Sequence, residues 1–539
     1  MSGVLVRFEP SGLSATVAPG TTLHAAAAAA GVHLVAPCGG FGRCGSCRVR
    51  AAGTMAPPDA AELDALGVAA RAGTRLACRA RVGAAGEVVV EVPEAPGLIR
   101  AQIASVGPEP RVESPQSRGV VAPAGVAALG AAVDIGTTTI AVRLHDLTDG
   151  RALGEIADLN PQVAWGHDVL SRVSRAVEGE AAELREAVTH QVEALVWTLS
   201  CTLRAAHGTL KEITVVGNPA MTRLFLGDDV SMLGDGASPG VDHPARVLDA
   251  AAAGMAKLGD ASVIVGPEVS AFIGADAVAG LLASGLAARP DDALLIDLGT
   301  NGEVVLASGG ALYAASAAAG PAFEGYGLTS GMRAEPGAIE AVWLDGDVLG
   351  LRTIDGQRPR GLCGSGLVDL LTVLLATGAL DVSGRLQPEG PLAPRVVETP
   401  GGRVFEVSSD VLLTQQDVRQ AQLAKAAVQV AIEMVLAAAG RSADGVAEVL
   451  VAGGFGSNLR PASLAALGVI PRAWAERVTL AGNAALAGAS AMLLSSAARR
   501  EADELAARVR TIDLAGRPEF QQRFIAALAF PAPPTPTER

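Results

Sequence analysis

The sequence predicts a multidomain protein in which a small α+β domain precedes a larger, duplicated α/β fold. Three observations carry this prediction: a cluster of cysteines near the start, a proline-rich segment after it, and a strand–Asp–x–Gly–Thr–strand pattern that occurs twice. A chain of 539 residues, 50% of them hydrophobic, is long enough to form several cores. We predict a small domain at 1–93, a linker at 94–130, a first lobe at 131–290, a second lobe at 291–510 and a C-terminal tail at 511–539.

The overall charge excludes one large class of function. The net charge is -14 and the isoelectric point is about 5.1, which argues against a nucleic-acid-binding surface. The chain begins with a strand-like run and lacks a basic and apolar leader, and no later stretch is bounded like a membrane span. We therefore expect a cytoplasmic protein that binds neither nucleic acid nor membrane.

Four of the six cysteines form a metal-binding pattern. Cys38, Cys44 and Cys47 share one glycine-rich loop with the spacing C-x5-C-x2-C, and Cys78 follows after a long gap. A [2Fe–2S] cluster needs four converging thiolates, and glycines let a short loop wrap it with backbone N–H groups turned toward the sulfurs. Zinc is the alternative, but zinc sites usually consist of two separated C-x2-C pairs. A disulfide framework is disfavoured because nothing marks the chain for export.

The segments around the cysteines support the cluster. Residues 4–8 and 14–17 are typical of a hairpin, residues 22–30 favour a helix, and residues 87–92 favour a closing strand. This order is similar to that of a β-grasp ferredoxin. The first cysteine gap has one residue more than the plant-type spacing, and it resembles the adrenodoxin-like and oxygenase-linked ferredoxins instead. The proline-rich segment that follows suits a partly extended tether.

The repeated pattern predicts a nucleotide site. Asp134 ends an apolar strand before the turn Gly136, Thr137, Thr138 and Thr139, and a related copy runs from Asp297 through Gly299, Thr300 and Asn301 to Glu303. Glycine and threonine amides and hydroxyls in such a turn can surround phosphate oxygens, while the carboxylate holds Mg²⁺ or its waters. Two such hairpins imply a duplicated nucleotide-binding fold.

The two hairpins resemble the phosphate loops of the superfamily of acetate and sugar kinases, heat-shock ATPases and actin, in which ATP lies between two related lobes. Residues 449–456, a strand that runs into Gly453, Gly454 and Gly456, resemble the adenosine loop of that superfamily, and residues 482–489 resemble its second connecting helix. Each segment alone could be a glycine-rich turn between core strands. Their order along the chain favours the superfamily.

The combination of the two halves resembles the ATP-dependent reductive activators of corrinoid proteins. This resemblance implies a β-grasp ferredoxin domain followed by a duplicated actin-like ATPase fold. It also implies an enzyme that returns an inactive Co(II) corrinoid on a methyl-transfer partner to Co(I), with an electron from an external donor. A homodimer is one open alternative for its assembly.

The resemblance also assigns roles to residues. Cys38, Cys44, Cys47 and Cys78 would bind the cluster, Asp134 and Asp297 would position Mg²⁺, and Glu303 and Glu324 are candidates for orienting a water. The two hairpin turns would hold the phosphates of ATP, and Gly453, Gly454 and Gly456 would lie against the adenosine. Residues 160–168 are a candidate contact with the partner. Cys201 and Cys363 are expected to be buried packing residues.

Two other functions fit parts of this pattern. A small-molecule kinase with a fused redox sensor would consume ATP and place the phosphate on a metabolite. An electron-transfer component of an oxygenase would need no nucleotide, but the acidic residues of both hairpins speak against it.

Overall fold

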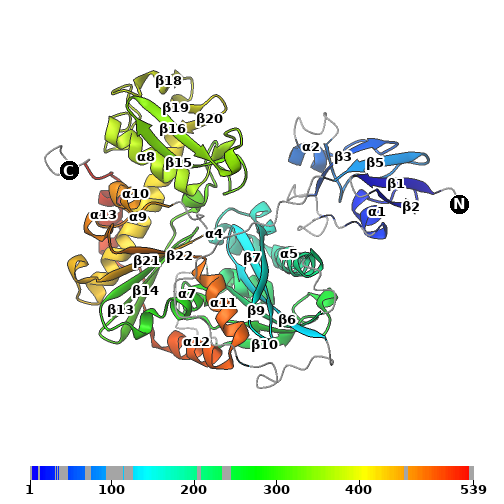
Figure 1. Cartoon of the computed structure of the whole chain (residues 1–539), viewed down its shortest axis with the longest axis horizontal. Coiled ribbons are helices and arrows are strands. Elements are labelled where there is room, and N and C mark those ends of the chain that lie inside the picture. The colour runs from blue at the N-terminus through cyan, green and yellow to red at the C-terminus, as the bar shows by residue number, and fades with distance from the viewer. Residues whose placement is uncertain are drawn as a thin grey trace.

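The structure is a computed structural model that describes residues 3–9, 12–30, 32, 34, 47–66, 74–92, 113, 126–202, 208–233, 244–453 and 459–532. The predicted site residues Cys38, Cys44, Gly454 and Gly456 lie outside this part of the chain. Figure 1 shows a small N-terminal unit beside a larger body that carries two mixed sheets.

The N-terminal unit is a five-stranded sheet in the order β2-β1-β5-β3-β4. Val4, Val6 and Phe8 alternate with exposed residues along β1, so that one face of this strand packs into a core. Strand β1 pairs antiparallel with β2 and parallel with β5, which confirms the predicted hairpin, helix and closing strand. The elements are β1 (Val4–Glu9), β2 (Leu13–Val17), α1 (Leu23–Ala29), β3 (Arg48–Gly53), α2 (Ala60–Leu66), β4 (Thr74–Leu76) and β5 (Glu87–Glu91).

Within the predicted linker, the structure describes Glu113 and residues 126–130, and Glu113 is attached to the larger body. Its carboxylate accepts hydrogen bonds from the Ser495 and Ser496 hydroxyls, at 2.9 and 2.5 Å, and from the Ala497 amide at 3.0 Å. These donors lie at the start of α12 (Ser496–Arg508), where a carboxylate satisfies amides that have no partner within the helix. The segment between the N-terminal unit and the larger body is therefore attached to the start of α12 at Glu113.

The larger body contains the predicted duplication. In the first lobe β6, β7 and β8 form an antiparallel meander, and β9 and then β11 add in parallel on the other side of β6. The second lobe repeats this arrangement with β12, β13, β14, β21 and β22. Strand β10 extends the first sheet and β23 extends the second.

The strands of the first lobe are β6 (Ala127–Ile135), β7 (Thr139–Asp146), β8 (Ala152–Leu159), β9 (Gly208–Gly217), β10 (Arg246–Asp249) and β11 (Ser262–Val265). Its helices are α4 (Val169–Arg175), α5 (Ala181–Thr202), α6 (Pro219–Leu226) and α7 (Ala275–Ser284). Strand β6 begins at Ala127, so the first lobe starts slightly before the predicted boundary at residue 131.

The second lobe has the sheet strands β12 (Ala293–Leu298), β13 (Gly302–Ser308), β14 (Ala311–Ala317), β21 (Glu448–Ala452), β22 (Val478–Gly482) and β23 (Val509–Thr511). Two three-stranded sheets are inserted between β14 and β21: β15 (Ala338–Asp345), β16 (Val348–Thr353) and β17 (Gly361–Leu362), then β18 (Val396–Thr399), β19 (Gly402–Ser408) and β20 (Val411–Thr414). Its helices include α8 (Gly364–Thr377), α9 (Gln415–Ala438), α10 (Pro461–Leu467), α11 (Ala484–Leu494), α12 and α13 (Pro518–Ala527).

Helices α7 and α11 join the two lobes. Their apolar residues share one core with residues from both large sheets. A Cβ atom added at Gly488 of α11 would lie 2.0 Å from the Ala279 carbonyl oxygen of α7, so a larger side chain at this position would force the helices apart. The small residues predicted for the second connecting helix therefore serve close packing.

Helix α9 is, within the described ranges, the one helix long and apolar enough to cross a membrane, but 72% of its apolar window is buried in the protein. It packs against β13, β14 and α13, as a core helix does. The segment predicted as a tail after residue 510 belongs to this packing, because Phe530 is buried in the core of the second lobe.

The two isolated cysteines differ from each other. Cys363 is buried at the start of α8, as expected. The expectation for Cys201 is wrong, since its side chain is exposed in the last turn of α5. Nearby Trp197 is also 47% exposed, so the apolar pattern at this end of the helix does not mark a buried face.

Candidate functional site

Two of the four predicted cluster ligands lie together in the N-terminal unit. Cys47 directly precedes β3, and Cys78 lies in the turn that follows β4. Both are buried, and their Sγ atoms are 3.2 Å apart. Since a metal–thiolate bond is about 2.3 Å long, two sulfurs at this separation can reach the same metal ion. The described pair therefore fits a metal centre.

A buried ion pair positions the turn that carries Cys78. The carboxylate of Glu62 in α2 accepts hydrogen bonds from the Arg75 guanidinium, at 2.8 and 3.0 Å, and from the Leu76 amide at 3.0 Å. The Ala77 amide in turn donates to the Cys47 carbonyl oxygen at 2.8 Å. These contacts fix the two cysteine segments relative to each other, which a cluster with four ligands requires.

The second candidate site is a group of acidic side chains where the two lobes meet. Asp134 is at the end of β6, Asp297 at the end of β12, and Glu303 directly opposite Asp297 on β13. Glu324 comes from the 3₁₀ turn Pro321–Glu324 of the second lobe. Asp276 in the first turn of α7 completes the group.

These carboxyl groups lie close enough to raise one another's pKa. Burial raises the pKa of Asp134 to about 6, although a hydrogen bond from Asn483 opposes the shift. Burial and then the charge of Asp134 raise the pKa of Asp297 to about 7 and that of Asp276 to about 8. Burial also raises the pKa values of Glu303 and Glu324. Such a concentration of acids favours a cation or a proton in the site.

The acids suit Mg²⁺ brought in with a nucleotide. In the described part of the chain, no three acidic, histidine or cysteine side chains are arranged to hold a metal ion directly. Mg²⁺ keeps several waters and is usually bound through one or two carboxylates together with substrate phosphates. Asp134 and Asp297 can supply such carboxylates because each ends the strand that leads into its hairpin.

The first hairpin turn, residues 136–139, is held by side chains outside the set of predicted site residues. The Asn218 side-chain amide donates to the Thr137 hydroxyl at 2.9 Å, and that of Asn160 donates to the Gly136 carbonyl oxygen at 2.8 Å. Asn160 is 0% exposed, as is Gln162. The expectation that this segment contacts a partner is therefore wrong for these two residues, which face the hairpin and the core.

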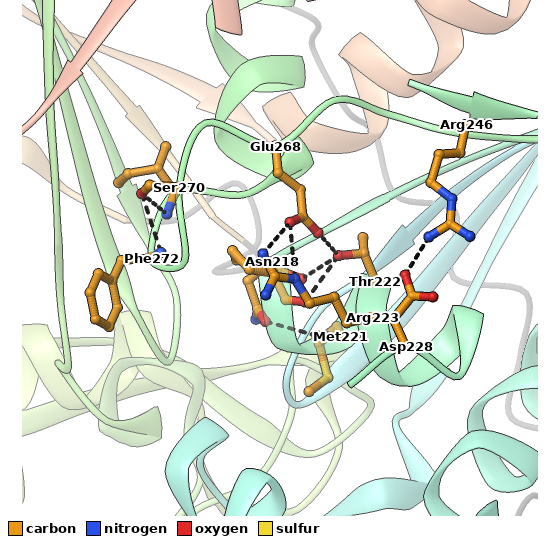
Figure 2. Close-up of polar contacts among 11 residues, drawn as sticks. Asn218, Met221, Thr222, Arg223, Asp228, Arg246, Glu268, Ser270 and Phe272 are labelled. Atoms are coloured by element: carbon orange, nitrogen blue, oxygen red, sulfur yellow. Dashed lines mark hydrogen bonds and ion pairs between the residues drawn. The ribbon is translucent and has the colours of Figure 1, made fainter. Parts of the chain in front are cut away.

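Figure 2 shows how Asn218 is fixed at the start of α6. Its side-chain oxygen accepts from the Met221 amide at 3.1 Å and caps the helix. Glu268, in the loop that leads to α7, accepts from the Thr222 hydroxyl at 2.5 Å and from Arg223 at 3.0 Å. The helix that presents Asn218 is thus attached to the segment that presents Asp276.

The second hairpin turn contacts both Glu324 and the first hairpin. The amide and the hydroxyl of Thr300 each donate to the Glu324 carboxylate at 3.1 Å. The hydroxyls of Thr138 and Thr300 are 2.9 Å apart, so the two hairpins meet across the lobes. Gly299 and Asn301 flank Thr300 in the same turn. This places the two predicted phosphate-binding turns at one site.

The predicted adenosine loop is described at its first glycine. Gly453 follows β21, and its amide donates to the Gly482 carbonyl oxygen at 3.0 Å. Its φ of 136° is a conformation that favours glycine. Asn483, which directly follows Gly482, caps α11, and its side-chain amide donates to the Asp134 carboxylate at 2.9 Å. The end of the second sheet is therefore linked to the first hairpin.

Four residues of this site were not among the predicted site residues: Asn160, Asn218, Asp276 and Asn483. Asp276 had a usable signal, since it is an acid placed just after a glycine at the start of an apolar helix. The three asparagines act through caps and long-range contacts, which spacing along the chain does not reveal.

Comparisons with protein-family models match nearly the whole chain. Residues 6–83 match a 2Fe–2S iron–sulfur cluster binding domain. Residues 129–289 match the RACo middle region, and residues 291–538 match the C-terminal domain of RACo, the ASKHA domain. These matches confirm the predicted order of a ferredoxin domain followed by an ATPase-type fold.

Two curated proteins and one solved structure are similar to this chain over most of its length. The corrinoid activation enzyme RamQ of Eubacterium limosum is 32% identical over 74% of this chain and 70% of its own. A [Co(II) methylated amine-specific corrinoid protein] reductase of Methanosarcina barkeri is 25% identical over 70% of this chain and 72% of its own. The solved structure of a reductive activator for corrinoid, iron–sulfur protein shares 27% identity and a TM-score of 0.71, covering 98% of both chains.

Proposed function

Because the chain belongs to the family of reductive activators of corrinoid proteins, we propose that it uses ATP to return an inactive Co(II) corrinoid on a partner protein to Co(I). Co(I) is the nucleophile that accepts a methyl group, so this reaction restores a methyl-transfer cycle after accidental oxidation. The protein is accordingly an enzyme that acts on another protein's cofactor.

One observation supports this function above the others. A single chain carries a ferredoxin domain with a paired cysteine site, and two Asp-x-Gly-Thr hairpins that meet at Thr138 and Thr300. An electron carrier alone would not need the acidic site between two lobes. A kinase alone would not need the cysteines. The combination suits a reaction in which a nucleotide controls the movement of an electron.

We assign the residues as follows. Cys38, Cys44, Cys47 and Cys78 hold a [2Fe–2S] cluster, which when bound supplies one-electron transfer. Asp134 and Asp297 hold Mg²⁺ or its waters, with Asp276 close to both. The hairpin turns bind phosphates, Glu303 and Glu324 orient a water, and the adenosine is approached by Gly453, Gly454 and Gly456.

Further features belong to the same proposal. The reduced state comes from an external electron donor, the protein works in the cytoplasm, and it is able to form a homodimer. The linker lets the ferredoxin domain reach the partner while Glu113 keeps one point of it on α12. The division into a ferredoxin domain, a linker, two lobes and a tail is part of this proposal.

The need for ATP follows from the energetics of the electron transfer. Plant-type clusters have reduction potentials near about -400 mV, and for one electron each 59 mV of unfavourable difference costs about a factor of ten in equilibrium constant. Binding of a nucleotide can favour the complex in which cobalt is easier to reduce. Typical coupling free energies between two sites, about 1–3 kcal/mol, are of the required size.

The test is a spectroscopic assay with matched variants. Reduced protein is mixed with a Co(II) corrinoid protein, with and without Mg-ATP, and the Co(I) absorption band is followed. We expect Co(I) with ATP, and none with Cys44→Ser or with Asp297→Ala. ADP formation that needs no corrinoid protein, together with phosphate on a metabolite, would favour a kinase instead.

A further inference from the structure

The first hairpin turn has an unusual set of backbone contacts. All four carbonyl oxygens of residues 136–139 accept hydrogen bonds: that of Gly136 from Asn160, that of Thr137 from Arg172, that of Thr138 from the Asn160 amide and that of Thr139 from the Gly136 amide. In a trans peptide the C=O and N–H groups point in opposite directions. The amides of Thr137 and Thr138 therefore point away from Asn160 and Arg172.

These two amides are available for a ligand. Within the described ranges, no hydrogen bond involves the N–H group of Thr137 or of Thr138. The hydroxyl of Thr138 lies 2.9 Å from that of Thr300, where the two lobes meet. Backbone N–H groups in successive residues of a turn form a concave site that suits phosphate oxygens.

Arg172 holds the central peptide of this turn from behind. It lies in α4 and is 0% exposed. Its Nη2 donates to the Thr137 carbonyl oxygen at 2.5 Å, its Nε donates to the Gly166 carbonyl oxygen at 2.9 Å, and its Nη1 is 3.3 Å from the Gln162 side-chain oxygen. All three nitrogen atoms of the guanidinium are therefore hydrogen-bonded to neutral acceptors.

The charge of Arg172 has no direct counter-ion in the described part of the chain, where no carboxylate forms an ion pair with it. Burial lowers its pKa to about 9, while the charges of Asp168 and Glu324 oppose this shift. A buried charge without an ion pair is costly. Nearby negative charge from a ligand would offset this cost.

We propose that Arg172 is a positioning residue for the phosphates of the nucleotide. It holds the Thr137–Thr138 peptide with its N–H group toward the phosphate, and it places a buried positive charge behind the turn. It acts through this peptide and does not touch the nucleotide. The inference rests on the proposed nucleotide site and adds a residue to which neither hairpin pattern points.

The test compares how Arg172 variants bind ligands that differ in phosphate. The affinities of the full-length protein for Mg-ATP and for adenosine are measured by calorimetry. We expect Arg172→Gln to weaken ATP binding by at least about tenfold and adenosine binding by less than about twofold, since a tenfold change corresponds to the loss of a charge-assisted contact. Arg172→Lys keeps the positive charge but loses the planar guanidinium with its several N–H donors. It should therefore weaken ATP binding less than Arg172→Gln does.

A matched control is Arg499→Gln. Arg499 also donates to backbone carbonyl oxygens, those of Met492 and Leu493, but it pairs with Glu212 and lies away from the hairpins. We expect it to leave the ratio of ATP to adenosine affinity unchanged. Thermal unfolding of each variant reports whether it is folded.

Three outcomes would overturn the role of Arg172. One is a folded Arg172→Gln variant with the ATP affinity of the wild type, and another is an equal loss for ATP and adenosine, which a purely structural role produces. If Arg172→Gln does not fold, the ATP affinities of Arg172→Lys and Arg499→Lys are compared instead. Equal affinities of these two variants would be the third outcome that overturns the role. A wild-type protein that does not bind ATP would instead overturn the proposed nucleotide site itself.

Discussion

The two phosphate hairpins share a sequence pattern but have different surroundings. In the first, side chains of Asn160 and Arg172 bind the carbonyl oxygens, and the amide of Thr138 makes no hydrogen bond within the described part of the protein. In the second, the amide and hydroxyl of Thr300 are both bound by Glu324. Glu324 also binds the Thr138 hydroxyl, so its carboxylate lies beside both turns. The turns differ in their amides: those of Thr137 and Thr138 make no hydrogen bond within the described residues, whereas that of Thr300 donates to Glu324.

This difference shows what a duplicated pattern determines and what it leaves open. The repeated strands place Asp134 and Asp297 at equivalent ends of two sheets. The groups that decide whether a turn attracts phosphate come from elsewhere: α4 in the first lobe and a 3₁₀ turn in the second. We infer that phosphate meets available amides at the first hairpin, whereas at the second it must displace Glu324 from the Thr300 amide.

The largest expected effect tests what the two hairpins have in common. Asp134→Ala and Asp297→Ala should each lower ATP-dependent formation of Co(I) by roughly 100-fold or more, because each removes a carboxylate for Mg²⁺ at the developing phosphate charge. The rate is measured from the Co(I) absorption band. The visible spectrum of the cluster should be unchanged in both variants, which serves as the control. Normal rates in either variant would contradict the shared role.

Removal of the charge on Glu324 tests what distinguishes the hairpins. Without Mg²⁺, Glu324→Gln should bind ATP more tightly than the wild type, on the order of tenfold, since a like charge beside the phosphates is lost. Calorimetry gives the affinities, and Glu389→Gln, an exposed acid of the same lobe, is the control. Unchanged or weaker binding would show that Glu324 does not compete with phosphate.

Much of this site could be predicted from the sequence because its residues lie in short, characteristic patterns. The spacing of Cys38, Cys44 and Cys47, and the two Asp-x-Gly-Thr turns, identify both halves of the chain. The fold class follows because each turn joins two apolar strands.

The remaining residues of the site could not be predicted because they act across long sequence separations. Arg172 is a charged residue in a short helix whose Leu170 is 60% exposed, yet it is fully buried under the first hairpin. Asn483 reaches Asp134 from the other end of the chain. Tertiary contacts of this kind follow from the packing of α4 and α11 and not from local pattern.

A smaller effect concerns pH and the acids between the hairpins. The pKa of Asp276 is raised from 3.8 to about 8 in the folded protein, so the folded state holds a proton that the unfolded state releases. Stability therefore falls as pH rises from about 4 through about 8. Asp276→Asn should be more stable than the wild type at pH 8, by at least about 1.4 kcal/mol, the equivalent of one pKa unit.

Thermal and denaturant unfolding at pH 5 and pH 8 measure this effect without nucleotide. The difference between Asp276→Asn and the wild type should shrink at the lower pH, where the wild-type carboxyl is already neutral. A difference that is constant with pH would indicate altered packing instead of a lost charge. Asp410→Asn, an exposed acid of the second lobe, provides the control.

The smallest expected effect concerns how the lobes bring the hairpins together. Arg333 of the second lobe pairs with Asp158 of β8 at 3.3 Å, and both are partly exposed, so the pair contributes about 0–1 kcal/mol. Arg333→Gln should shift Tm by less than about 4 °C and speed ATP association by about twofold, because the lobes separate more easily. Stopped-flow binding measures the rate. The control is Arg403→Gln, whose ion pair with Glu398 lies within one hairpin of the second lobe. It should leave the rate of ATP association unchanged.

In the proposed function, ATP permits one electron to pass from this protein to a corrinoid. The most direct test is a single-turnover experiment in which equal amounts of reduced protein and a Co(II) corrinoid protein are mixed, and cluster oxidation and Co(I) formation are recorded together. We expect one Co(I) formed for each cluster oxidised when Mg-ATP is present, and little Co(I) formation or cluster oxidation without it. Equal Co(I) formation in the absence of ATP would contradict the proposed function.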